Sequence, residues 1–112
     1  MSAHIALIKG DGIGADVCDA ATYLVDLCLR LVGETPLAIT KIDAGAAYFQ
    51  ETGADIEAGG EDTAGKCDAI FLGAIGLPSI RHPNGTEISP HLRLRERFQL
   101  YAGVRPVKAY PN

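Results

Sequence analysis

Two arginines near the end of the chain combine a residue type suited to anion binding with mostly apolar neighbours. Arg95 lies in HLRLRERFQ, where a spacing of 100° per residue places it on the same helical arc as His91, Leu94 and Phe98. Arg105 lies in YAGVRPVKAY and alternates with apolar residues of a strand-like segment. Two converging guanidinium groups could hold a carboxylate or a phosphate by paired hydrogen bonds. Internal salt bridges to some of the 14 acidic residues account for the same spacing equally well.

The other side of this expected helix carries Arg93, Glu96 and Arg97. We expect these two arginines to be solvated, with their stems covering apolar surface. Ser89 is the expected N-cap and Pro90 the first helical residue, because both types favour those positions. The helix is therefore predicted to turn Arg95 inward and Arg93 and Arg97 outward.

A glycine motif, IKGDGIGADV, follows the first apolar run of the chain. Gly10, Gly12 and Ala15 satisfy the G-x-G-x-x-G/A spacing of a dinucleotide-binding turn. Asp11 and Asp16 would repel a pyrophosphate there, and they suit the positive end of a helix dipole instead. The acidic residue that binds the ribose, expected about 20 residues further on, is also missing. The motif therefore indicates a tight strand-to-helix turn and not a Rossmann site.

The elements around these residues alternate between strand and helix patterns. Apolar runs predict strands, and helical spacing of apolar residues between Val17 and Leu31 predicts a helix. The expected elements are strands at 4–8, 36–42, 69–74 (an interior strand) and 101–110, a helix at 16–32, two short helices within 44–68 with a turn near Gly53, and a proline-rich loop at 76–85. This order predicts an α/β fold, an open, mostly parallel sheet with flanking helices, in a single domain over residues 1–112.

Composition narrows the function further. The chain has 112 residues and a net charge of -4, which argues against a nucleic-acid partner, and it has no apolar run long enough to span a membrane. The three cysteines are expected to be free in a reducing compartment, which points to the cytoplasm. The three histidines share no helical face with a second metal ligand, and no serine or cysteine has an assignable base.

Three motifs together resemble the N-terminal part of the isocitrate/isopropylmalate dehydrogenase family, the metal-dependent β-decarboxylating dehydrogenases. They are GDGIG at 10–14, CDAIFLGAIGLP at 67–78 and LRLRERFQLYAGVRPVKAYP at 92–111. The resemblance covers nearly the whole chain, and it implies an isopropylmalate dehydrogenase-like fold. Its third motif, with two arginines ten residues apart and a proline after the second, is the most specific.

The resemblance assigns roles to residues by position. Arg95 and Arg105 would bind the carboxylate of a malate-like substrate. Residues that would recognise the substituent distinguishing one 2-hydroxy acid from another are Ser89, His91 and Leu92. Residues that would border the nicotinamide cofactor are Ile13, Gly73 and Ala74.

The reaction that the resemblance implies is oxidation of the hydroxyl-bearing carbon by NAD, followed by decarboxylation assisted by Mg²⁺ or Mn²⁺. The substrate stays open among 3-isopropylmalate, isocitrate, tartrate and D-malate, as does NAD versus NADP. The catalytic and metal-binding residues of such an enzyme would lie beyond Asn112, some of them in the second subunit of a homodimer, so the chain alone is expected to be inactive. The alternative is a non-catalytic α/β module that binds a carboxylate or a phosphate.

Overall fold

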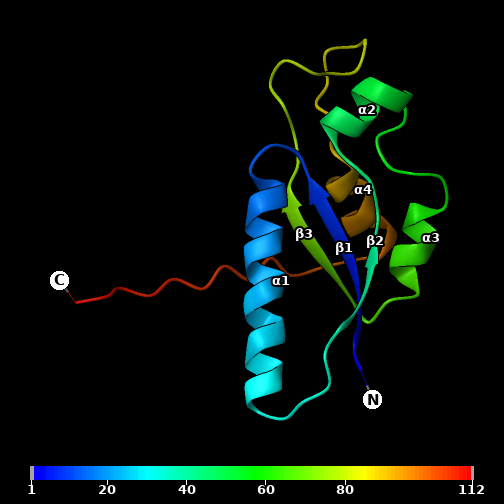
Figure 1. The fold of residues 1–112 in the computed structure, drawn as a ribbon. Helices are drawn as coiled ribbons and strands as arrows, with labels where there is room; N and C mark the ends of the chain where they lie inside the picture. The colour runs from blue at the N-terminus through cyan, green and yellow to red at the C-terminus, as the bar shows by residue number, and fades with distance from the viewer. Residues whose placement is uncertain (1, 112) are drawn as a thin grey trace.

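Residues 2–111, which the computed structural model describes, form a parallel β-sheet with helices on both faces (Figure 1). The strands are β1 (His4–Gly10), β2 (Ala38–Lys41) and β3 (Ala69–Ala74), in the order β2-β1-β3. Both pairs are parallel, with Ile5 opposite Ile39 of β2 and Ala69 of β3. The predicted α/β architecture, an open parallel sheet with flanking helices, is confirmed.

Within the described residues, four helices connect or follow the strands. They are α1 (Gly14–Leu31), α2 (Ala46–Thr52), α3 (Gly60–Gly65) and α4 (Pro90–Arg97). The predicted long helix and the two short ones are therefore confirmed. Gly53 ends α2 with a φ of 78°, a left-handed conformation that glycine adopts without steric cost, as expected for the predicted turn.

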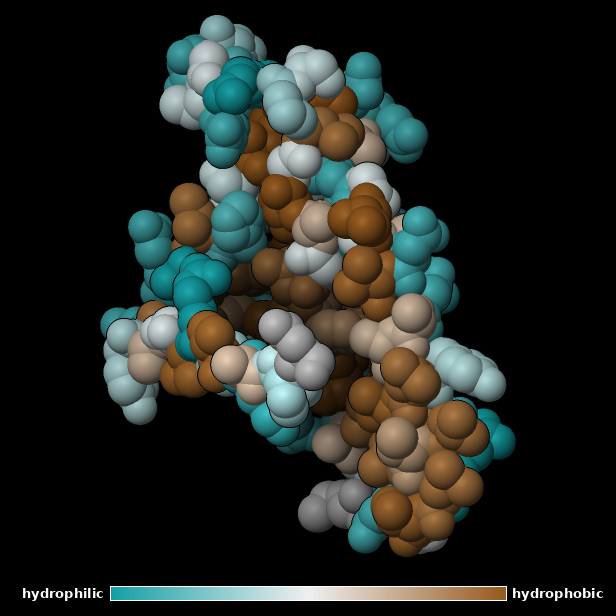
Figure 2. All heavy atoms as spheres, turned by 90° about the vertical axis from the view of Figure 1, so that its left-hand side faces the viewer, coloured by the Kyte–Doolittle hydropathy of each residue, from teal (hydrophilic) through white to brown (hydrophobic). Residues whose placement is uncertain are grey.

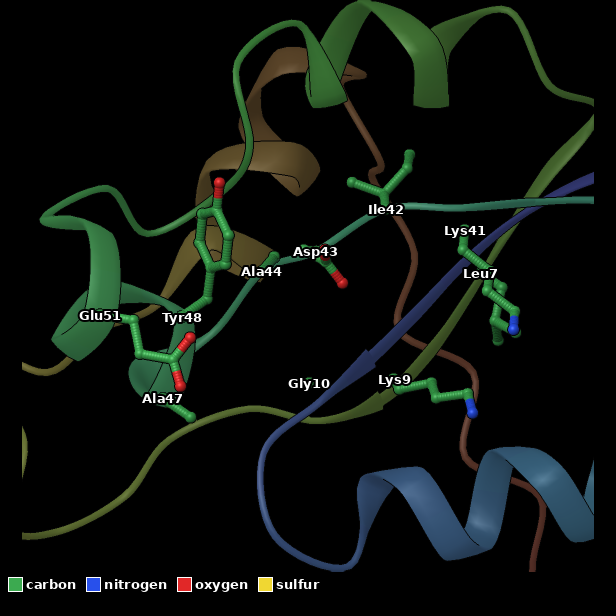
Figure 3. A pocket seen from close by; sticks show the side chains of 10 residues that line it. All are labelled: Leu7, Lys9, Gly10, Lys41, Ile42, Asp43, Ala44, Ala47, Tyr48 and Glu51. Atoms are coloured by element: carbon green, nitrogen blue, oxygen red, sulfur yellow. The ribbon is translucent and has the colours of Figure 1, made fainter.

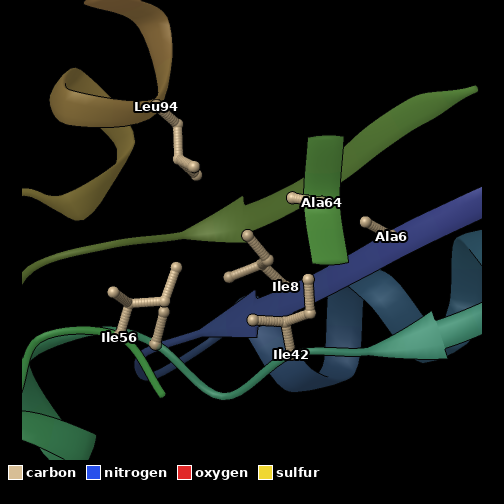
Figure 4. Close-up of a cluster of buried hydrophobic side chains, with 7 residues drawn as sticks. Ala6, Ile8, Ile42, Ile56, Ala64 and Leu94 are labelled. Carbon is tan, nitrogen blue, oxygen red and sulfur yellow. The ribbon is translucent and has the colours of Figure 1, made fainter. Parts of the chain in front are cut away.

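The main hydrophobic core lies between the sheet and the α3–α4 layer. Side chains of β1 alternate, so that Ala6 and Ile8 point into this core and both are 0% exposed. Figure 4 shows them facing Ile42, Ala64 and Leu94, which come from the end of β2, from α3 and from α4. Leu94 is thus the residue by which α4 enters the core.

Within residues 2–111, α1 alone covers the opposite face of the sheet, and much of its apolar surface stays exposed. Its buried residues are Gly14 and Cys18, whereas Leu24 is 57% and Leu31 is 77% exposed. In Figure 2, which looks at this side of the molecule, hydrophobic side chains cover much of the visible surface. The sheet has only three strands within residues 2–111, so one flank of the helix has nothing to pack against.

β3 is an edge strand within residues 2–111, although its apolar run predicts an interior position. Ala69 and Leu72 are exposed, Leu72 at 36%, and the other four residues of β3 are half-buried. A fully apolar strand suits burial on both faces, and here its outer edge has no partner strand in the described part of the chain.

The segment after α4, residues 101–111, forms no strand in the structure and leads away from the body of the molecule (Figure 1). Tyr101 is 100% and Val107 is 95% exposed. A strand forms only when its backbone pairs with another, and none of the described strands pairs with this segment. The strand predicted at 101–110 is therefore wrong for this structure.

Among residues 2–111, the structure has no helix that is both long enough and apolar enough to cross a membrane. All three cysteines, Cys18, Cys28 and Cys67, are free, as predicted.

Candidate functional site

The glycine motif forms the tight turn between β1 and α1. Gly10 and Gly12 have φ values of 73° and 52°, a region where side chains are strained. A Cβ on Gly10 would lie 1.9 Å from the carbonyl oxygen of Ala74, and one on Gly14 would lie 2.1 Å from that of Lys9. The glycines therefore allow the turn to press against the end of β3, which confirms the interpretation as a strand-to-helix turn.

Asp11 in this turn is a buried anchor, with only 2% of its surface exposed. Its carboxylate accepts hydrogen bonds from the backbone N–H groups of Ala46 and Ala47, both at 2.8 Å, and of Gly76 at 2.7 Å. The expectation that Asp11 serves the dipole of α1 was wrong: it faces the start of α2 and the loop after β3. Asp16 alone takes the predicted place in the first turn of α1. One carboxylate thereby ties three segments together at the carboxyl end of the sheet.

The three residues predicted to border the cofactor lie close to this anchor. The N–H of Asp11 donates to the carbonyl of Ala74 at 2.6 Å. A Cβ on Gly73 would lie 2.2 Å from the carbonyl oxygen of Lys9, so Gly73 is packed tightly against β1. Ile13, at the N-cap of α1, is 68% exposed. The structure brings the three together, and Ile13 is the one that offers a large side chain to a ligand.

A hollow of about 330 Å³ lies nearby, at the carboxyl ends of β1 and β2 (Figure 3). Its charged and hydroxyl side chains are Lys9, Lys41, Asp43, Tyr48 and Glu51. None of the predicted substrate or cofactor residues lines it. Sequence reasoning did not find it, because only parallel pairing brings the ends of two separated strands to one edge of the sheet.

On α4, the predicted substrate-recognition residues occupy the first turn. Ser89 is the N-cap and Pro90 opens the helix, as predicted, but the Ser89 hydroxyl donates to the carbonyl of Glu87 at 3.2 Å instead of capping a helix N–H. Leu92 is 47% exposed. Together with Arg95 it lines an open hollow of about 570 Å³ that also includes Glu96, Gln99, Leu100 and Tyr101.

His91 lies in this turn and is half-buried, and Nδ1 of its ring is buried without a hydrogen-bond partner among residues 2–111. Burial lowers the pKa of His91, and the positive charge of Arg95 lowers it further. The ring is therefore held in its neutral form near pH 7. A neutral imidazole with a free nitrogen can accept or donate one hydrogen bond, depending on the tautomer.

The inward orientation predicted for Arg95 is wrong, whereas Arg93 and Arg97 lie on the exposed side of α4, as predicted. Arg95 is exposed, whereas Arg93 and Arg97 bind the carboxylates of α3 and of the preceding loop. The buried arc is narrow and centred on Leu94, so Arg95, one residue further and about 100° around the axis, falls outside it. Among residues 2–111, Arg95 has no carboxylate within ion-pair distance. The internal salt bridge considered for Arg95 is therefore absent from the described residues.

The contacts of Arg93 and Arg97 form one network. Nη1 and Nη2 of Arg93 lie 2.8 and 3.0 Å from the two oxygens of Asp55, and Nε donates to Glu61. Nη1 of Arg97 lies 2.6 Å from the other oxygen of Glu61, and Nη2 pairs with Asp62. These hydrogen bonds, first from Arg97 and then from Arg93, lower the pKa of Glu61. The prediction that both arginines are merely solvated was wrong.

Arg105 lies in the exposed segment after α4 and has no ion pair within the described residues. Since this segment leads away from the body in Figure 1, the structure does not bring Arg105 together with Arg95. The predicted clamp is therefore not formed within residues 2–111: Arg95 lies on a packed helix and Arg105 lies on a segment without a partner strand.

No group of three or more histidine, cysteine, aspartate or glutamate side chains among residues 2–111 is arranged to hold a metal ion. The divalent metal implied by the resemblance therefore has no ligand set in the described residues, and we assign it none.

Comparisons with known proteins agree on one family. A family model described as isocitrate/isopropylmalate dehydrogenase matches residues 4–112. A 3-isopropylmalate dehydrogenase of Heyndrickxia coagulans is 36% identical over 113 aligned residues, covering 98% of this chain and 30% of that protein. A probable tartrate dehydrogenase/decarboxylase of Agrobacterium vitis is 33% identical, covering 96% of this chain and 30% of that protein.

Among solved structures, a β-decarboxylating dehydrogenase from Thermococcus kodakarensis, in its apo form, superposes with a TM-score of 0.65 at 30% identity. The match covers 90% of this chain and 28% of that one. The chain thus spans about 30% of the length of the curated relatives it matches.

Proposed function

The chain belongs to the isocitrate/isopropylmalate dehydrogenase family, and from this premise we propose that it supplies one wall of the active site of a β-decarboxylating dehydrogenase. The proposed reaction is the NAD-dependent and Mg²⁺- or Mn²⁺-dependent oxidation and decarboxylation of a malate-like 2-hydroxy acid. The chain's own task in it is to bind and orient substrate. The homodimer expected from the resemblance remains a prediction.

The observation that carries this proposal is the state of Arg95. It is exposed on the hollow of about 570 Å³, with no carboxylate partner among residues 2–111, while its two neighbours on α4 are neutralised. An unpaired guanidinium presents a fork of N–H donors that matches a carboxylate bidentately. Arg95 would hold one carboxylate of the substrate, and Arg105 would join it once the segment that carries it is held in place.

The first turn of α4 would contact the part of the substrate that Arg95 does not bind. Leu92 offers an exposed apolar contact. The unpartnered Nδ1 of His91 is buried, so it would contact a substrate only if the ring turned toward the hollow. A site with Leu92 at its surface suits a substituent that is at least partly apolar. Holding the substrate in one orientation lowers the entropic cost of reaching the reactive geometry.

The turn after β1 would face the cofactor. Ile13 provides an exposed apolar side chain at the start of α1, and the tightly packed Gly73 and Ala74 fix the surface behind it. NAD, when bound, would accept the hydride from the hydroxyl-bearing carbon. The chemistry of Ile13 fits a contact with a flat, weakly polar ring and not with a phosphate.

Titration of the 112-residue chain with dicarboxylates tests this proposal. We expect D-malate, D-tartrate or 3-isopropylmalate to bind and D-lactate, with one carboxylate, to bind less well, as measured by calorimetry. Arg95→Lys should abolish binding while sparing stability, because lysine lacks the bidentate fork, and Arg30→Lys serves as the matched control. Equal affinity of wild type and Arg95→Lys would overturn the role of Arg95.

A second assay separates the enzyme from the non-catalytic module. The chain alone, incubated with substrate, NAD and Mg²⁺, is expected to produce no NADH. Steady NADH production would contradict the view that the catalytic groups lie outside these residues. Preferential binding of inorganic phosphate over every dicarboxylate would favour the module.

A further inference from the structure

The ion-pair network between α4 and the α3 region joins the helix that carries Arg95 to the rest of the fold. α4 has eight residues, and an isolated helix of that length is not stable in water. Its N-cap makes no side-chain hydrogen bond to the helix. The position of α4 therefore depends on tertiary contacts.

Two kinds of contact hold α4. Leu94 is buried in the core, 4% exposed, and Phe98 packs beside that core. Pro90, which is fully buried, Leu94 and Phe98 follow one another at four-residue spacing, so one stripe of α4 faces the core. Apolar packing therefore sets the buried face of α4, and contacts on the exposed side are needed to resist smaller rotations about the helix axis, because apolar contacts are non-directional.

The ion-pair network supplies directional contacts on the exposed side of α4. Arg93 and Arg97 are one helical turn apart, and each donates to a different oxygen of Glu61. Nη1 and Nη2 of Arg93 also donate hydrogen bonds to the two carboxylate oxygens of Asp55. Bidentate arginine–carboxylate pairs have a fixed planar geometry. A rotation of α4 would break these pairs together.

The network also determines which arginine stays free. Asp55 and Glu61 are the less exposed carboxylates, with side chains 17% and 19% exposed, and both are occupied by arginines. If Arg93 were absent, Asp55 would lose its arginine partner and Glu61 would keep only Arg97. Because both carboxylates are occupied by Arg93 and Arg97, neither is available to pair with Arg95.

We propose that Arg93 and Arg97 are positioning residues, which lock α4 onto Glu61 and Asp55 so that Arg95 faces the substrate hollow as an unpaired cation. This inference rests on the proposed function, because it assigns to Arg95 the binding of a substrate carboxylate. It adds two arginines and two acids, none of which touches the substrate, to the residues that determine substrate affinity.

The test uses the ¹⁵N-labelled 112-residue chain and D-tartrate as the probe. Arg93→Gln, Arg97→Gln and the double variant are compared with Arg30→Gln, which breaks the Arg30–Asp26 pair on α1 and leaves α4 untouched. We expect the double variant to bind D-tartrate about tenfold more weakly and Arg30→Gln to bind it like the wild type. Arg93→Lys keeps the positive charge but loses the paired N–H donors of the guanidinium, so its affinity for D-tartrate should lie between those of the wild type and the double variant.

Two spectroscopic signals separate positioning from a merely structural role. The Nε–Hε signal of Arg95 reports the order of its side chain, and exchange of the Leu100 amide, which donates to the carbonyl of Arg95 at 3.0 Å, reports the end of α4. Both should become more mobile in the double variant, while the Ile42 amide, bonded to Leu7 in the sheet, stays protected.

Each outcome of the titration and of the two spectroscopic measurements either supports or overturns the proposal. Unchanged affinity and unchanged Arg95 order in the double variant would overturn the proposal, as would loss of order without loss of affinity. If the wild-type chain binds no D-tartrate, the proposed function fails for this chain. The positioning role is then tested by the Arg95 Nε–Hε signal and by exchange of the Leu100 amide alone, and unchanged signals in the double variant would overturn it. If the double variant does not fold, Arg93→Lys and Arg97→Gln carry the same comparison.

Discussion

α4 and the segment that follows it each carry one of the two arginines expected to bind substrate, and the protein holds them very differently. α4 is fixed by Leu94 in the core and by ion pairs from Arg93 and Arg97. The segment with Arg105 forms no strand and no ion pair within residues 2–111. A helix satisfies its own backbone and needs only one face covered, whereas a strand needs a neighbour for its backbone groups. Arg95 therefore lies on a packed helix, whereas Arg105 lies on a segment that pairs with no strand within residues 2–111.

Substitution of Asp11, which binds the start of the loop that leads to α4, should have the largest effect on stability. Asp11 accepts three backbone hydrogen bonds, one of them from Gly76 at the start of the loop that leads to α4. Asp11→Asn loses the charge and places an N–H₂ group against N–H donors. We expect a loss of about 3 kcal/mol of unfolding free energy, or a fall of about 10 °C in Tm. Asp16→Asn, an exposed carboxylate in the same region, is the control and should change Tm little.

A smaller loss of unfolding free energy is expected when the ion-pair network between α4 and the α3 region is broken. Arg93→Gln should lower the unfolding free energy by about 1 kcal/mol, and Tm by about 4 °C, since its pairs are partly exposed. High salt should reduce the difference from wild type, because salt screens surface pairs. A thermal melt at two salt concentrations measures both. A difference that grows with salt would show that the contribution of Arg93 is not electrostatic.

The network should also respond to pH. The hydrogen bonds from Arg97 and Arg93 hold the pKa of Glu61 below its ordinary value, while Asp55 and Asp62 share the same arginines. A depressed folded-state pKa contributes stability that is present above the unfolded pKa of about 4.3 and disappears as pH falls through the folded value. The stability gap between wild type and Glu61→Gln should therefore narrow as the pH is lowered from 6 to 3. Chemical denaturation at several pH values measures this difference in unfolding free energy. A difference that stays constant from pH 6 to pH 3 would contradict the prediction.

The segment after α4 should matter least for stability. Its side chains are exposed, with Val104 at 84% and Val107 at 95%. Arg105→Gln, or truncation after Leu100, should change Tm by less than about 2 °C. A drop as large as that of Arg93→Gln would show that the segment packs onto the body in solution, and the contrast with α4 would disappear.

Much of the fold could be predicted from local patterns. The apolar runs of β1 and β3, the helical spacing of α1 and the left-handed glycine at Gly53 are properties of short segments, and the structure has each of them. The glycines of the first turn were also assigned correctly as a close-packed turn. These features depend on neighbours in the sequence.

Features that depend on distant neighbours were predicted less well. Helical periodicity placed Arg95 on an apolar arc, but the width of the buried arc depends on what α4 packs against, and α3 offers carboxylates to Arg93 and Arg97. In the same way, Asp11 finds its donors in Ala46, Ala47 and Gly76, far along the chain. No pattern of spacing contains those pairings.

The sequence by itself determined the family, through motifs whose residue types and spacing match over residues 4–112, and it determined the order of strands and helices. Only the tertiary structure decided which arginine of α4 is free, which acid is buried, and that Arg105 stands without a partner strand within residues 2–111. The physical reason is that secondary structure follows from local backbone sterics and periodic burial, whereas the state of a charge depends on which distant groups the fold brings within hydrogen-bonding distance.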